Sequence, residues 1–187
     1  MPPPHPEHLF EQADALIRGA ARETDLRRAI SNAYYALFHF VLTAAADMVV
    51  GADQRATARY SFVYRSVEHS QLRAVCSQVR ATAPQNVALC PTGGFGGIAD
   101  FARITLNLQE LRNQADYDPS KEFSSSDAEI EVSNARQAIK WFQEGSLEQQ
   151  QAFLTMVLFK SRSSQQRTQA ALSTPTRQST GRALNAR

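Results

Sequence analysis

Apolar residues recur along most of this chain at spacings of three and four positions, the period of a helix that packs on one face. The clearest example is residues 24–50, where a broad apolar face runs from Ile30 to Val49. Helices of this kind are predicted at about residues 6–19, 24–50, 69–79, 98–117, 126–144 and 146–160. No stretch carries a convincing strand alternation, so the pattern predicts an all-α fold.

Residues at the ends of these ranges agree with the helix boundaries. Pro119 cannot continue the helix before it, and it disfavours helical geometry in the residue that precedes it. Ser126 with Glu129, and Ser146 with Gln149, have the spacing of a capping box, in which two side chains satisfy free amide groups at a helix N-terminus. These pairs predict that new helices begin at Ser126 and Ser146.

The predicted helices fall into consecutive segments. Residues 6–145 are predicted to form an up-and-down bundle of four to five helices, and residues 146–160 add a C-terminal helix. Residues 161–187 consist mostly of Ser, Thr, Gln, Arg and Ala and are predicted to be disordered. That tail holds five arginines and no acidic residue, whereas the whole chain has a formal charge of +2. The preceding 160 residues therefore carry −3, which gives no support to a basic nucleic-acid-binding surface over the whole fold.

Composition bounds the environment in which the protein works. With 43% hydrophobic residues over 187 positions, the chain can bury a core of its own. Its longest apolar segment, residues 33–50, is interrupted by His39, Thr43 and Asp47, which favours a buried helix over a membrane span. The sequence shows no leader, and its two cysteines are too few for a disulfide framework. These features predict a soluble protein of the reducing cytoplasm that is not bound to a membrane.

A second, polar stripe follows the long apolar helix. Ser31, Tyr35 and His39 recur every four residues on one side of it. One interpretation is a half-buried seam whose hydroxyl and imidazole groups find hydrogen bonds inside the bundle. The other interpretation is functional and places the seam in the same cleft as Arg112, in the helix predicted at residues 98–117.

Polar chemistry also concentrates at the end of that later helix. Asp116 and Asp118 lie at its C-terminus, where the negative end of the helix dipole ordinarily disfavours each carboxylate by roughly 0.3 kcal/mol or more. Exceptions to a local rule tend to fall at functional or specifically paired positions. Arg112 lies one turn before Asp116 and is its obvious ionic partner.

Three other patterns invite a functional interpretation, and the sequence favours an ordinary one for each. Between residues 52 and 67 arginines are interleaved with aromatic residues, which could stack bases and hold phosphates but more often anchor a surface connection. The glycine-rich end of the irregular segment 82–97 lacks the Lys-Ser/Thr pair of a phosphate-binding loop. His5 and His8 have no further ligand cluster beside them, so neither a metal nor any other cofactor is predicted.

Two segments together resemble the HEPN domain family, in particular a bacterial group of it. RRAISNAYYALFHFV at residues 27–41 is similar to that group's S-x-A-Y-Y-A-x-F-H helix, and LRNQADYDP at residues 111–119 is similar to its R-x-x-A-D-Y helix. The order of the two motifs agrees, and His69 opens the helix between them. The resemblance covers about residues 6–145. It implies a helical bundle that dimerises about its longer helices, often a metal-independent endoribonuclease in toxin–antitoxin or antiviral defence systems.

The resemblance also implies where a site would lie. The family's catalytic signature is an arginine, usually a polar residue next, and a histidine four to six positions after the arginine. Arg112 and Asn113 match the first two positions, whereas Tyr117 stands where the histidine would be, and no histidine follows it. The predicted catalytic residues are Arg112, Asn113, Asp116 and Tyr117, and the predicted substrate-binding residues are Tyr35, His39 and His69.

The missing histidine decides between functions. Metal-free RNA cleavage needs a group that takes the 2′-hydroxyl proton and a cation that stabilises the charged phosphorane. Arg112 could supply the cation, but a tyrosine, with an ordinary pKa of about 10, is a poor general base. The sequence therefore favours a catalytically degenerate HEPN-like dimer that associates with RNA or nucleotide.

Two alternatives stay open. One is an active metal-independent endoribonuclease that uses Arg112 with a non-standard base, for which His39 or His69 would have to lie close by. The other is a module that only dimerises or binds a partner protein. The partners that the resemblance implies are a second copy of the chain, RNA or nucleotide, and a cognate antitoxin or nucleotidyltransferase-like protein.

Overall fold

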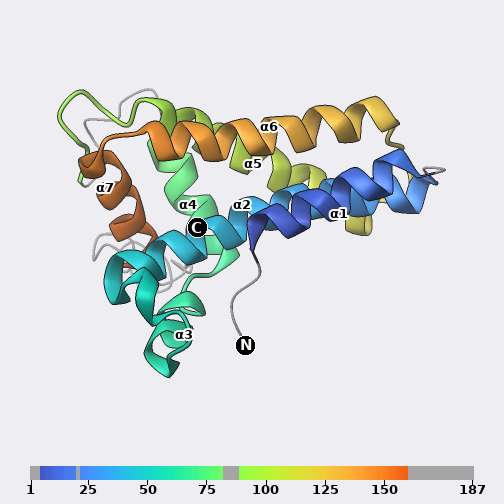
Figure 1. Cartoon of the computed structure of the whole chain (residues 1–187). Helices are drawn as coiled ribbons and strands as arrows, with labels where there is room; N and C mark the ends of the chain where they lie inside the picture. Colours follow the sequence, from blue (N-terminus) through green and yellow to red (C-terminus); the bar gives the residue numbers. More distant parts are fainter. Residues whose placement is uncertain (1–4, 20–21, 82–88, 160–187) are drawn as a thin grey trace, which may run out of the picture.

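Helices make up the whole of the regular structure in residues 5–19, 22–81 and 89–159, the parts of the chain that the computed structural model describes. No strand is found in those ranges, and the prediction of an all-α helical bundle is confirmed (Figure 1). The elements are α1 (Pro6–Arg18), α2 (Glu23–Val50), the 3-10 helix η1 (Ala52–Gln54), α3 (Ala58–Tyr64), α4 (His69–Val79), α5 (Gly97–Tyr117), α6 (Ser125–Glu144) and α7 (Leu147–Leu158).

Helix α2 is the centre of the bundle. It contacts α1, α3, α5, α6 and α7, and Figure 1 shows α1 lying alongside it while α5 and α6 form the opposite layer. Its three- and four-residue apolar spacing buries Ile30, Ala33, Leu37 and Val41 completely. The other helices therefore pack around a helix that is apolar over most of its circumference.

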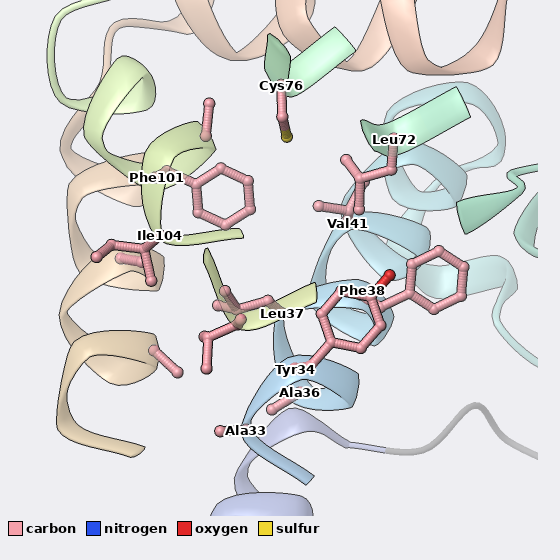
Figure 2. Close-up of a cluster of buried hydrophobic side chains, with 14 of the residues drawn as sticks. Ala33, Tyr34, Ala36, Leu37, Phe38, Val41, Leu72, Cys76, Phe101 and Ile104 are labelled. Carbon is pink, nitrogen blue, oxygen red and sulfur yellow. The ribbon is translucent and has the colours of Figure 1, made fainter. Parts of the chain in front are cut away.

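The core continues from α2 into its neighbours. Figure 2 shows side chains of α2, α4 and α5 converging, and the cluster includes the fully enclosed Leu37, Leu72 and Phe101. Phe101 also meets Phe142 of α6 and Phe153 of α7 edge-to-face, with ring centroids 5.1 and 5.7 Å apart. Such aromatic pairs add about 0.5–1.5 kcal/mol each beyond the burial of their surface. Helix α7 thus packs into the same core as the bundle.

Several predicted helix ends agree with the structure. Helix α1 begins at Pro6, α4 begins at His69, and α5 ends at Tyr117, two residues before the proline. Helix α7 begins where the second capping box was expected, because the Ser146 hydroxyl accepts the amide of Gln149 at 3.2 Å.

The start of α6 was predicted at the wrong serine. Its N-cap is Ser124 and not Ser126, and the Ser124 hydroxyl accepts the amide of Asp127 at 3.1 Å. The Asp127 carboxylate accepts the Ser124 amide in return, at 2.9 Å. An aspartate can therefore fill the place of the glutamate in this box, and the run of three serines hid which one acts as the cap.

The connection between α2 and α4 contains a helix that the sequence pattern did not reveal. Residues 58–64 form α3, which the Thr57 hydroxyl caps at 3.2 Å from the Tyr60 amide. Tyr60 is buried and donates to Asp47 of α2 at 2.8 Å, so an aromatic residue does anchor this segment. With seven residues, α3 is too short to show a helical period. The predicted tail at 161–187 and residues 82–88 of the irregular segment 82–97 lie outside the described residues.

Among the described helices, α2 is long and apolar enough to cross a membrane by length and composition alone. In the structure, half of its most apolar window is buried inside the bundle. The core helix of a soluble protein meets the same criteria, so this composition is weak support for a membrane span.

Candidate functional site

The polar stripe of α2 and the C-terminal half of α5 face each other. Leu108 lies on the apolar side of α5 and is completely buried, which leaves Arg112 and Asp116 off the core stripe. From there Arg112 reaches Tyr35 and Asp116 reaches Ser31, both on α2. Two members of the α2 stripe therefore meet the pair of charges on α5.

Every nitrogen of the Arg112 guanidinium has an oxygen beside it. Nη2 donates to the Tyr35 hydroxyl at 2.6 Å, and Nη1 donates to Oδ1 of Asn113 at 3.2 Å. Nε lies 2.8 Å from Oδ2 of Asp116, but its N–H is not directed at an acceptor, so this contact is an ion pair and not a hydrogen bond. The side chain is only 21% exposed. The cation is thus fixed by three neighbours and largely covered.

Two tyrosine rings flank the same cation. The guanidinium carbon of Arg112 lies 5.4 Å from the ring centroid of Tyr35 and 5.6 Å from that of Tyr117, both within cation–π range. Tyr117 is 74% exposed, whereas Tyr35 is half-buried. Tyr117, in the position that the resemblance gives to a histidine, therefore forms the solvent-facing cover of Arg112.

Burial is the largest single influence on the pKa of Arg112 and disfavours the charge. The hydrogen bond to Tyr35 and the electrostatic interactions with Tyr35, Asp116 and Tyr117 together outweigh burial, so the pKa of Arg112 is raised. Asp116 is itself fixed by the Ser31 hydroxyl, which donates to Oδ1 at 2.8 Å. The carboxylate at the unfavourable end of the helix is specifically paired, as the sequence pattern suggested.

Arg27 of α2 covers the C-terminus of α5. Its Nη1 donates to the carbonyl oxygens of Ala115 and Asp118, each at 3.0 Å, and its Nη2 donates to the carbonyl of Lys121. Its Nε pairs with Glu23 at 2.9 Å, and the side chain is 18% exposed. The last carbonyls of a helix lack backbone partners, and a cation there also opposes the negative end of the dipole. Arg27 thus caps the carbonyl groups at the end of α5 and places a positive charge at the negative end of its dipole.

His69 lies on the other side of Tyr35. Its Nδ1 is 2.7 Å from the Tyr34 hydroxyl, its ring stacks on Phe38 with centroids 3.8 Å apart, and it meets the Tyr35 ring edge-on at 6.2 Å. Burial lowers the pKa of His69, and the nearby charge of Arg112 lowers it further. A neutral imidazole therefore stands near Arg112 at neutral pH.

His39 is turned towards α3. Its Nδ1 lies 2.6 Å from the hydroxyl of Tyr64, and the two rings stack with centroids 6.1 Å apart. Burial lowers the pKa of His39, with His69 adding to the effect, and burial raises the pKa of Tyr64 to about 12. His39 therefore has its hydrogen-bond partner on α3 and not on α5.

The sequence pattern assigned no role to the two arginines that precede the α2 stripe. Arg27 holds the end of α5, and Arg28 lines an open depression of about 580 Å³ together with Asp116 and Tyr117. Arg28 is exposed and makes no ion pair or hydrogen bond with any residue that the structure describes. Their position one turn before Ser31 indicates from sequence that they adjoin the polar stripe, but it does not show which of the two reaches α5.

The arrangement suits phosphate or base contact better than strong electrophilic catalysis. A cation that is already balanced by a carboxylate offers a weaker field to a charged phosphorane. Tyr117 and Arg28 instead expose, on one surface, a ring face and a charge that no described residue pairs. Within the described ranges no three His, Cys, Asp or Glu side chains converge as a metal site would require.

Comparisons with known proteins add no relative to this picture. No family model matches the sequence, and neither the curated proteins nor the solved structures yield a significant match.

Proposed function

We propose that this protein is a HEPN-like homodimeric module that associates with RNA or nucleotide and does not cleave it. The proposal rests on the resemblance of two helices and on the way they pack, since α2 and α5 bring both motifs together. The same resemblance points to a bacterial toxin–antitoxin or defence setting. There, an antitoxin or a nucleotidyltransferase-like protein is the expected partner.

One observation carries the non-catalytic part of the proposal. Arg112, the match to the family's catalytic arginine, is tied to Tyr35, Asn113 and Asp116 and is covered by Tyr117. An arginine that stabilised a phosphorane would need to turn towards the substrate, which here means giving up these contacts. The arrangement supports a structural role for Arg112 in joining α5 to α2.

The association with RNA draws on the surface next to that cluster. The exposed ring of Tyr117 offers a stacking face, which is worth about 1–3 kcal/mol per base in proteins that bind single strands. Arg28 lies on the same depression with its charge unpaired by any described residue. A base on Tyr117 and a phosphate on Arg28 would use both groups without disturbing Arg112.

Fluorescence anisotropy with a labelled, mixed-sequence single-stranded RNA tests this surface. Tyr117→Ala should weaken binding about tenfold, because it removes one stacking contact. Arg28→Ala should weaken binding less and should reduce the slope of log K against log salt by about 0.7, since one phosphate contact is lost. Arg103→Ala removes an exposed arginine of α5 that is paired with Asp100 and is the matched control.

The outcome of that titration is decisive for the binding surface. The proposal requires Arg103→Ala to bind like the wild type while both site variants bind less tightly. If the wild type shows no saturable binding, this surface does not bind RNA. The same conclusion follows if Tyr117→Ala, Arg28→Ala and the control Arg103→Ala all bind with equal affinity.

His69 favours a second candidate function, an active metal-independent endoribonuclease. It is a neutral imidazole beside Tyr35, with its charge disfavoured by burial and then by Arg112, and such a group could take a proton from a 2′-hydroxyl. In that case His69→Ala and Arg112→Ala would each abolish a cleavage activity that the wild type shows without metal.

A module that only dimerises or binds protein is the third candidate. Its support is the acidic balance of the first 160 residues, which does not attract nucleic acid over the fold as a whole. A protein of this kind would sediment as a dimer and would leave RNA anisotropy unchanged at any salt concentration.

A further inference from the structure

A pocket of about 910 Å³ lies between α1, α2 and α6 and shares no lining residue with the cluster around Arg112. Its apolar surface comes from Phe10 of α1, Phe40 and Ala44 of α2, and Ile139 of α6. Small-molecule sites in proteins span roughly 300–1,000 Å³ and are lined mainly by such side chains, with a few polar groups among them. The size and the apolar surface both fit a small organic ligand.

Two of the three cations that line the pocket are already paired. Arg55 pairs with Asp47 through contacts of 3.0 and 2.5 Å. Arg136 pairs with both Glu7 and Asp14, each at 3.1 Å. These pairs hold the surrounding helices in place, and their charges are balanced without a ligand.

Lys140 and Thr43 are among the polar residues of the pocket whose side chains have no hydrogen-bond or ionic partner in the described part of the chain. Lys140 is exposed, and its ammonium makes no ion pair or hydrogen bond with any described residue. Thr43 also lines the pocket, and its buried hydroxyl has no hydrogen-bond partner among the residues that the structure covers. Buried hydroxyl groups are normally satisfied, so one that is not satisfied points to a group that the described protein atoms do not supply.

We propose that this pocket binds a small amphipathic organic anion, with its apolar body against Phe40, Ala44 and Ile139 and its anionic group on Lys140. A carboxylate, sulfonate or phosphate would serve, because each offers the negative charge and the acceptor oxygens that an ammonium takes. An inorganic anion would leave the apolar surface unused, and a neutral hydrocarbon would leave Lys140 unpaired. The proposed ligand therefore has both an apolar body and an anionic group.

This site is independent of the proposed RNA surface. Its lining residues come from other faces of α1, α2 and α6, and none of them contacts Arg112, Asp116 or Tyr117 through a hydrogen bond or an ion pair. Either proposal can fail while the other holds.

A matched pair of probes tests the proposal on the full chain. 1-Naphthylacetate has an apolar aromatic body and one carboxylate, and 1-naphthylacetamide has the same body without the charge. Calorimetric titration should show saturable binding of both, with the acid about two- to fivefold tighter, the range expected for one exposed ion pair. The methyl NMR signals of Ala44 and Ile139 should shift as either probe binds.

Two variants separate the contributions. Lys140→Gln should abolish the preference for the acid and leave the amide unaffected, whereas Lys121→Gln, which changes an exposed lysine outside the pocket, should keep the preference. Ala44→Leu places a larger side chain in the pocket and should weaken both probes. Thermal unfolding shows whether the Ala44→Leu variant is folded. The Lys140→Gln variant tests the proposal even if Ala44→Leu does not fold.

The proposal is overturned by any of three results. One is the absence of saturable binding by either probe. Another is a preference for the acid that survives in Lys140→Gln. The third is a pattern of NMR shifts that leaves Ala44 and Ile139 unaffected while the probe saturates.

Discussion

Tyr35 holds Arg112 with both parts of its side chain. Its hydroxyl accepts a hydrogen bond from Nη2 at 2.6 Å, and its ring centroid lies 5.4 Å from the guanidinium carbon. The tyrosine belongs to α2 and the arginine to α5, so the contact joins the two helices whose motifs resemble those of a nuclease family. In this protein the residues of those motifs stabilise one another.

Tyr35→Phe keeps the ring and removes the acceptor. Hydrogen bonds to charged groups contribute about 1.5–3 kcal/mol, and partial exposure reduces this, so the free energy of unfolding should fall by about 1–2 kcal/mol. Urea denaturation measures the change. Tyr117→Phe is the matched control, because the Tyr117 hydroxyl bonds to no described residue, and its effect should stay within about 0.5 kcal/mol. Equal losses in both variants would contradict a specific role for the Tyr35 hydroxyl.

Arg27 is predicted to contribute far more to the stability of the fold than Arg28 does. Arg27→Met removes the donor that serves the carbonyls of Ala115, Asp118 and Lys121, and should cost about 2–3 kcal/mol of unfolding free energy. Hydrogen exchange in the last turn of α5 should accelerate in the same variant. Arg28→Met changes an exposed side chain without described partners and should cost less than about 0.5 kcal/mol. Similar losses of unfolding free energy in Arg27→Met and Arg28→Met would rule out a stabilising cap by Arg27 on α5.

The two serines at the start of α6 give a matched comparison. Ser124→Ala removes the hydroxyl that caps the Asp127 amide and should destabilise the protein by about 1 kcal/mol. Ser126→Ala, in the first turn of the helix, should be neutral or slightly stabilising, since alanine is the better helix former. Thermal unfolding of the two variants distinguishes them. A larger loss of stability in Ser126→Ala than in Ser124→Ala would indicate that Ser126 is the N-cap, as the sequence predicted.

Stability should fall in mildly acidic solution because of His39 and His69, whose pKa values are lowered in the folded protein. Burial lowers the pKa of His39 and of His69 below the ordinary value of 6.5, so the unfolded chain binds more protons than the folded one just below that pH. The part of the unfolding free energy that depends on these two histidines is therefore at its maximum above about pH 7. It declines as the pH drops through about 6.5 and below. It levels off once the folded histidines are protonated as well.

Histidine variants assign this pH dependence. The double variant His39→Gln with His69→Gln should unfold with a flatter profile between about pH 7 and pH 5, above the range in which Asp47, whose pKa is lowered, takes up protons. His8→Gln, at an exposed position of α1, should keep the wild-type profile. An unchanged slope in the double variant would mean that other groups cause the acid sensitivity.

Local patterns allowed much of the fold to be predicted. Long amphipathic periods identified α2 and α5, and the proline at 119 and the Ser146 box identified helix ends, because these signals depend on residues close together in the chain. Helix α3 and the cap at Ser124 were missed, since a seven-residue helix shows no period and neighbouring serines are alternatives of similar strength.

The candidate site was less accessible to prediction. The pairing of Arg112 with Asp116 follows from their spacing, but the hydrogen bond to Tyr35 joins residues 77 positions apart. The cap that Arg27 places on α5 spans a similar separation, and the side of α2 that His39 faces depends on α3. Such relationships are set by how the helices pack, which one sequence does not specify.

Metal-free incubation with RNA tests the central claim most directly. Wild-type protein and Arg112→Ala are incubated with mixed-sequence RNA in the presence of a chelator, and each reaction is resolved on a native gel and on a denaturing gel. The account predicts a retarded complex of the wild-type protein on the native gel and intact RNA from both proteins on the denaturing gel. Cleavage by the wild type that is lost in Arg112→Ala would contradict it.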